Sequence, residues 1–179
     1  VCSSDLTSIA VVTVATNRYL DYWKSMAKSA DALLMPDSSL CFYVFTDRPE
    51  QASEWANELE RATVTPIRVP ALGWPDATLR RYELFADVWD RISEDLVVHL
   101  DADMLVTAQV PTPDARSWPG GIALVRHPGY RRPSNGARVE LYRRNPRMLG
   151  GDVRSWWRYG ALGAWETSRE SLAFVPRSE

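Results

Sequence analysis

The sequence predicts a single α/β domain built on a mostly parallel sheet. Short β-branched and aromatic runs alternate along the chain with segments of helical composition, as in strand–helix–strand units. The runs at 8–14, 40–45 and 96–100 are apolar at most positions, which favours strands buried on both faces. A length of 179 residues suits one such domain.

Each element is predicted from its local pattern. The first strand is 8–14, and a helix follows because apolar residues recur at three- and four-residue steps from Leu20 to Leu34, before Pro36. The second strand is 40–45, with a turn at 46–49. The remaining predicted elements are a helix at 50–61, a strand at 63–69, a helix at 78–89 and a strand at 96–100.

The pattern loosens after Leu105. Prolines and glycines mark loops, 122–125 is one more short strand, and the arginine-rich stretch 131–163 is interpreted as a loop–helix insertion. Residues 1–7 receive no weight because they resemble an assembly artefact. We expect both ends of the chain to be truncations, so a removed signal peptide would leave no trace.

Composition excludes several classes of protein. Hydrophobic residues make up 45% and charged residues 25%, which argues against disorder, and no apolar run approaches the ~20 residues of a transmembrane helix. A net charge of −2 disfavours nucleic-acid binding through bulk charge. Cys2 and Cys41 form neither a CxxC motif nor a disulfide framework, and Cys41 is predicted to be a small core residue.

Charge is uneven along the chain. Residues 1–107 carry 17 acidic and 9 basic side chains, whereas residues 108–179 carry 6 acidic and 12 basic ones. The basic part is either a solvated arginine-rich face or a surface for an anionic substrate or membrane. Of the 21 basic residues 19 are arginine, which is typical of a GC-rich bacterial genome. We expect a cytoplasmic location, either free or in peripheral contact with a membrane.

The strongest chemical signal is the pair Asp101 and Asp103 directly after the strand at 96–100. Ligands bind beyond the carboxyl ends of the strands in parallel α/β sheets, so this pair stands where a site is expected. Two close carboxylates repel unless a cation joins them, and Mg²⁺ or Mn²⁺ prefers such oxygen ligands. Two alternatives are open: the aspartates are solvated residues of a turn, or Asp101 is the nucleophile of a phosphatase. The phosphatase is less favoured, because in such enzymes the aspartate pair usually follows the first strand, and here it follows the fourth.

Three weaker features accompany the acidic pair. Thr78 is predicted to cap a helix on which Arg81 lies one turn further along, where its guanidinium suits a phosphate or sugar hydroxyls; ordinary surface Arg–Glu pairs are the alternative. The segment 14–19 after the first strand lacks the G-x-G-x-x-G fingerprint, so Tyr19 and backbone groups would hold a base rather than a dinucleotide. His99 is interpreted as a packed core residue and His127 as the better site candidate.

Together these blocks resemble glycosyltransferase family 6, which includes the ABO blood-group and α-1,3-galactosyl transferases. The matching blocks come in order, at 14–16 with Tyr19, 42–47, 74–83, 101–104, 127–130, 164–166 and 169–176, with Thr78 where the family has Ser. The insertion at 131–163 interrupts the resemblance and is longer than in the animal enzymes.

The resemblance implies a GT-A fold, Mn²⁺ (or Mg²⁺) bound at a DXD motif, and transfer of galactose or N-acetylgalactosamine from a UDP-sugar with retention at the anomeric carbon. The acceptor would be a glycan or a lipid-linked hydroxyl. It implies a metal site at Asp101 and Asp103, an acceptor contact at His127, and donor contacts at Val14, Ala15, Thr16, Tyr19, Trp74, Thr78, Arg81, Asp101 and Ala102.

The resemblance also has a gap, because the family's catalytic glutamate would lie beyond Glu179. No catalytic residue is therefore expected within the chain, and two alternatives stay open. One is a non-catalytic domain that binds nucleotide-sugars, and the other is the metal-dependent phosphatase.

Overall fold

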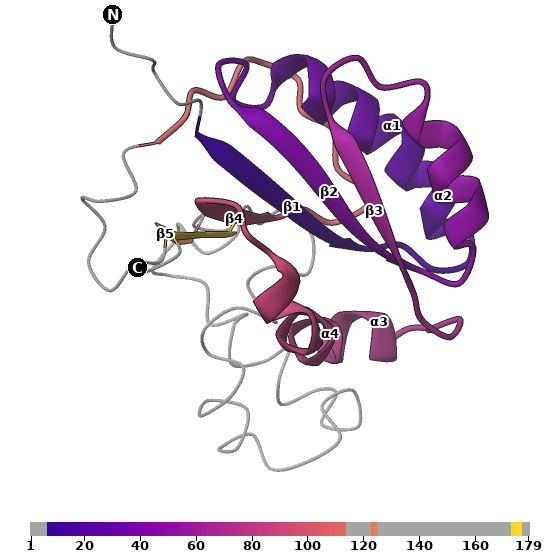
Figure 1. Cartoon of the computed structure of the whole chain (residues 1–179). Helices are drawn as coiled ribbons and strands as arrows, with labels where there is room; N and C mark the ends of the chain where they lie inside the picture. The colour runs from indigo at the N-terminus through magenta and orange to yellow at the C-terminus, as the bar shows by residue number, and fades with distance from the viewer. Residues whose placement is uncertain (1–6, 114–122, 125–172, 177–179) are drawn as a thin grey trace, which may run out of the picture.

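The computed structural model describes residues 7–113, 123–124 and 173–176. Strands β1 (Ser8–Val14), β2 (Ser39–Thr46), β3 (Thr63–Arg68) and β4 (Leu96–His99) alternate with helices along the chain (Figure 1). The helices are α1 (Tyr19–Leu33), α2 (Pro49–Ala56), α3 (Asp76–Leu79), α4 (Arg81–Asp87) and the 3₁₀ turn Trp89–Arg91. Two short strands follow, β5 (Ala123–Leu124) and β6 (Ala173–Pro176). The predicted α/β class is confirmed.

The sheet has the order β3-β2-β1-β4-β6-β5. Strands β1 to β4 are all parallel, with Val11 paired to Phe42 on one side and to Val98 on the other. This four-strand parallel unit flanked by helices is compatible with a Rossmann-like fold. Strands β6 and β5 join the edge at β4 in the antiparallel sense. The predicted strands 8–14 and 63–69 are confirmed, the latter to within one residue.

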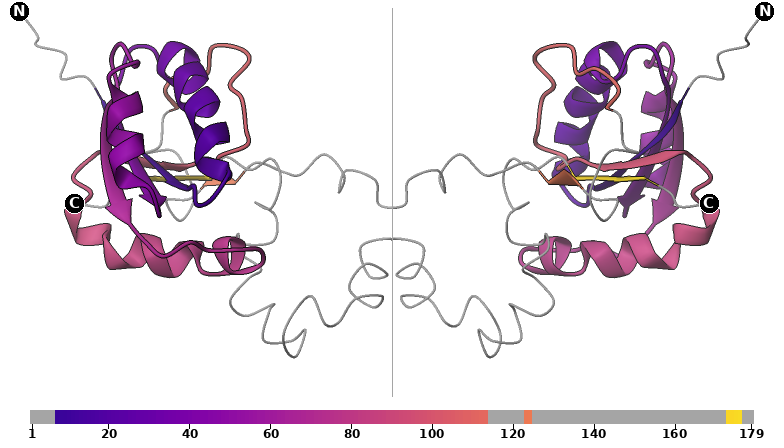
Figure 2. Two further views of the ribbon diagram at one scale, coloured as in Figure 1. Left: turned by 90° about the vertical axis from the view of Figure 1, so that its right-hand side faces the viewer. Right: turned by 90° about the vertical axis from the view of Figure 1, so that its left-hand side faces the viewer.

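Helices cover both faces of the parallel unit. Figures 1 and 2 show α1 and α2 on one face and α3 and α4 on the other. Because side chains alternate along a strand, Ile9 and Val11 pack beneath α1, while Ala10 and Val12 pack toward α4. Two apolar layers therefore hold the sheet, which explains why its strands are apolar at consecutive positions.

Several predicted elements need correction. The helix predicted at 78–89 is broken at Arg80, which ends α3 and precedes α4, and Thr78 lies inside α3 rather than at its cap. The helix predicted at 50–61 ends at Ala56. Cys41 is only partly buried, since β2 presents it beside Thr65 of the edge strand β3. Residues 173–176 form strand β6 by pairing with β4. This strand was not predicted, because so short a segment shows no clear local periodicity.

A partly buried arginine, Arg61, joins α1 to the start of β3. The Arg61 guanidinium donates to the carbonyl oxygens of Asp31, Met35, Ser38, Ala30 and Leu34 at 2.6–3.2 Å. Carbonyl groups at the C-terminal end of a helix lack partners in a following turn, and the Arg61 guanidinium supplies donors to this end of α1. In return the Asp31 carboxylate accepts the backbone N–H groups of Glu60, Arg61 and Ala62.

A buried hydroxyl ties β1 to the end of β4. Thr13 is fully buried, and its Oγ1 donates to the Leu100 carbonyl oxygen at 2.9 Å. We expect Thr13→Val, which keeps the shape but removes the donor, to lower the free energy of unfolding by about 1 kcal/mol. Urea denaturation measures this loss, with Thr107→Val, at an exposed threonine, as the control. Equal stabilities of the two variants would contradict the prediction.

Candidate functional site

The loops at the carboxyl edge of the parallel strands are tied to one another. Thr16, after β1, donates from Oγ1 to the Leu72 carbonyl oxygen at 2.7 Å, so the loop after β3 lies against it. The backbone N–H of Asn17 donates to Asp47 Oδ1, after β2, at 2.9 Å, and its side-chain amide donates to Leu72. Asn17 adopts a φ of 56°, a conformation that Asn tolerates better than most residues.

Arg81 and Asp101 form a buried ion pair at this edge. Nη1 of Arg81 lies 2.6 Å from Oδ1 of Asp101, and the two side chains are 6% and 14% exposed. The break at Arg80 makes Arg81 the first residue of α4, where its Nε donates to the Thr78 carbonyl oxygen at 3.0 Å. Nη1 also lies 3.3 Å from Nε2 of His99, at the end of β4.

Burial dominates the electrostatics of these groups. It raises the pKa of Asp101 to about 6; the nearby charge of Asp103 adds to the rise, and Arg81 opposes it. Burial, and after it the charge of Arg81, holds the pKa of His99 well below its usual range. His99 is therefore a neutral imidazole at physiological pH. The prediction that it is a packed residue is confirmed, but its ring also contacts a charged group.

Asp103 differs from Asp101 in its surroundings. Its side chain is exposed, while Ala102 between them is buried, and the N–H of Met104 closes a turn onto the Asp101 carbonyl oxygen at 3.2 Å. Mg²⁺ and Mn²⁺ sites that bind phosphates need only one or two carboxylates from the protein, so this pair fits such an ion. Within the described residues no group of three or more His, Cys, Asp or Glu side chains is placed to hold a metal.

The other predicted donor residues take three kinds of position. Ala15 and Thr16 are buried and Val14 is partly buried, and the Thr16 hydroxyl is already used by Leu72. Tyr19 and Trp74 are 41% and 68% exposed, so their rings are open to a ligand. His127 and the insertion 131–163 lie outside the described residues, as do residues 1–6.

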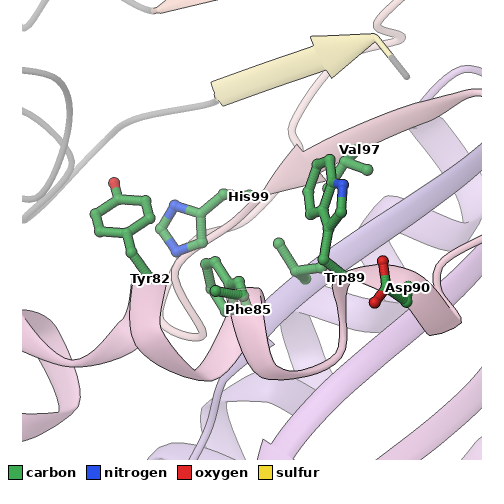
Figure 3. A pocket seen from close by; sticks show the side chains of 8 residues that line it. Tyr82, Phe85, Trp89, Asp90, Val97 and His99 are labelled. Atoms are coloured by element: carbon green, nitrogen blue, oxygen red, sulfur yellow. The ribbon is translucent and has the colours of Figure 1, made fainter. Parts of the chain in front are cut away.

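A cavity of about 490 Å³ opens along α4, on the sheet face away from α1. Figure 3 shows Tyr82, His99 and Phe85 at one end of it, and Trp89, Val97 and Asp90 at the other. Its wall is largely apolar, and His99 connects it to the Arg81–Asp101 pair.

Sequence reasoning missed the contacts that hold the edge together. Asn17, Asp47 and Leu72 belong to the loops after β1, β2 and β3, and the first two carry side chains suited to turns. Their positions just past strand ends were a usable signal. Leu72 accepts two of these hydrogen bonds through its backbone carbonyl. Its residue type gives no indication of this.

No protein-family model matches the chain, and no curated protein gives a significant match. Membership in glycosyltransferase family 6 therefore stays a prediction that rests on the motifs. In the described ranges, no helix combines the length and the apolar character needed to cross a membrane.

Proposed function

We propose that this chain carries the donor half of a retaining glycosyltransferase that moves galactose or N-acetylgalactosamine from a UDP-sugar to a glycan or lipid-linked hydroxyl. The observation that carries the proposal is the acidic pair at the end of β4, with Arg81 paired to the buried member and Asp103 exposed. It lies at the edge where parallel α/β sheets bind ligands. The ordered motifs of the sequence supply the sugar and the family.

The proposed roles follow from exposure and charge. Asp103 and the Asp101 oxygen that Arg81 does not hold would bind Mn²⁺, which when bound stabilises the charge of the departing diphosphate. Arg81 fixes Asp101 and adds positive charge near the sugar. The exposed rings of Tyr19 and Trp74 offer flat faces for uracil or sugar.

The phosphatase alternative is less well supported by this geometry. Such phosphatases usually carry the aspartate pair directly after the first strand, whereas Asp101 and Asp103 follow β4, the fourth strand along the chain. A domain that binds a nucleotide-sugar without transferring it is compatible with the same contacts, and transfer to an acceptor is the measurement that separates the two.

Calorimetric titration with UDP, with and without Mn²⁺, tests the site. We expect Mn²⁺ to raise UDP affinity at least about tenfold, and Asp103→Asn to remove that gain, because the metal loses an exposed carboxylate. Asp87→Asn, an exposed aspartate at the end of α4, is the control and should keep the gain. UDP affinity that is the same with and without Mn²⁺ in the unaltered chain would refute the metal site.

Two assays bear on the functional class. Transfer of galactose or N-acetylgalactosamine from the UDP-sugar to a glycan acceptor marks a transferase, whereas binding without turnover fits both the donor half and a binding domain, because no catalytic residue is expected within the chain. Hydrolysis of p-nitrophenyl phosphate that depends on Asp101 would instead support the phosphatase.

A further inference from the structure

His99 lies at the end of β4, and its ring packs against two aromatic rings of α4. The residue is 5% exposed, and its ring centroid lies 5.4 Å from that of Phe85 and 6.4 Å from that of Tyr82. Figure 3 shows the imidazole next to these two rings at one end of the cavity. The ring therefore has little freedom to turn, and its nitrogens keep fixed directions.

Arg81 determines which nitrogen of His99 carries the proton. Guanidinium nitrogens only donate, so Nε2 of His99, 3.3 Å from Nη1 of Arg81, serves as the acceptor. A neutral ring whose Nε2 accepts carries its hydrogen on Nδ1. With a hydrogen on Nε2 instead, two donors would face each other, and its bond to Asp101 Oδ1 would be long, at 3.5 Å.

This arrangement uses both hydrogens of Nη1. One goes to Oδ1 of Asp101 at 2.6 Å and the other to His99 Nε2, while Nε donates to the Thr78 carbonyl oxygen. The guanidinium is thus fixed by acceptors on α3, at the end of β4 and in the turn that follows β4. A guanidinium held in this way binds one Asp101 oxygen and does not swing to take both.

The cost of this tautomer supports a role for it. Nδ1 of His99 is buried without a hydrogen-bond partner among the described residues. An unpaired buried donor is unfavourable, whereas an apolar residue in the same cavity wall would leave no such donor. Of the two ring nitrogens, only Nε2 has a hydrogen-bond partner among the described residues, and that partner is Arg81.

We propose that His99 is a positioning residue, which holds Arg81 so that it engages only Oδ1 of Asp101 and leaves Oδ2 to a divalent cation. The inference rests on the proposed function for its metal, but the state of Arg81 is a property of the protein alone. A side chain that orients a ligand's partner typically changes metal affinity 10- to 100-fold, and we expect about tenfold here.

The test compares His99→Leu, which lacks an acceptor, with His99→Gln, whose side-chain oxygen can replace Nε2. We expect the Leu variant to lose about tenfold in the Mn²⁺ affinity of the UDP complex and the Gln variant to recover most of it. Val97→Ala is the matched control, because it lies on the same strand and lines the same cavity. It should lower the melting temperature without changing Mn²⁺ affinity.

Nitrogen-15 NMR without ligand provides an independent readout. We expect His99 to show the Nδ1–H tautomer, and the Nη1 hydrogens of Arg81 to exchange slowly in the unaltered chain and fast in His99→Leu. An Nε2–H tautomer, unchanged exchange, or equal Mn²⁺ affinity in the Leu and Gln variants would overturn the positioning role. Absence of Mn²⁺-dependent UDP binding in the unaltered chain would overturn the proposed function instead, and the NMR result would still decide the role of His99.

Discussion

Replacing Arg61 with alanine is expected to lower the free energy of unfolding by about 3 kcal/mol. The variant removes a donor from five carbonyl groups and leaves those of Asp31, Leu34 and Ser38 without the donor that now satisfies them, while the Ala30 and Met35 carbonyls keep backbone N–H partners. Met35 is also held at a φ of 48°, which is costly for a residue other than glycine. Guanidinium chloride denaturation followed by circular dichroism measures the loss.

Two further variants make the Arg61 result specific. Arg61→Lys should recover less than half of the loss, because an ammonium group has three donors and lacks the planar fork. Arg68→Ala removes an ion pair to Glu50 in which both side chains are mostly exposed, and should change stability by less than about 0.5 kcal/mol. Similar losses in Arg61→Ala and Arg68→Ala would show that the Arg61 contacts do not hold α1 in place.

Replacing Arg81 with alanine is the second change with a large expected effect, and it acts on both stability and binding. It leaves the mostly buried Asp101 carboxylate without its cation, which typically costs about 3–5 kcal/mol. We expect a loss near the lower figure, since Asp101 keeps partial contact with water. Mn²⁺-dependent UDP binding should fall below detection in calorimetry, because the free carboxylate is no longer oriented.

A double variant separates the two effects of Arg81. Arg81→Ala combined with Asp101→Ala should be more stable than Arg81→Ala alone, because no buried charge is then left unpaired. It should still fail to bind UDP with Mn²⁺. Arg80→Ala is the control, because Arg80 is the neighbour of Arg81 in the chain and its ion pair with Glu83 is exposed to solvent. If Arg81→Ala bound UDP and Mn²⁺ normally, Arg81 would have only a structural role.

The parallel core was predictable because its signals are local. A strand covered on both faces must be apolar at successive positions, and the runs 8–14, 40–45 and 96–100 have that property. Helix α1 was predictable since one of its faces is buried against the sheet along its whole length. The split of the helix at 78–89 was not, because Arg80 and Arg81 are both good helix formers, and it is Arg81 that is drawn inward to Asp101.

Much of the candidate site was predictable as a location but not as a set of contacts. Asp101, Asp103 and Arg81 were selected because they follow a strand or begin a helix, and the structure brings Arg81 onto Asp101. The prediction gave both aspartates to the metal and did not foresee that one is mostly buried and the other exposed. His99 was interpreted as core, and only its distance to Nη1 of Arg81 reveals its second contact.

The sequence by itself determined the α/β class, the parallel strands and the placement of an acidic pair at a strand end, because each depends on residues close together in the chain. The tertiary structure decided which distant groups meet: Arg61 with the end of α1, Thr16 with Leu72, and Arg81 with both His99 and Asp101. These contacts join residues 18 to 56 positions apart. Hydrogen bonds at that separation depend on how the strands pair and the helices pack, which no local pattern specifies.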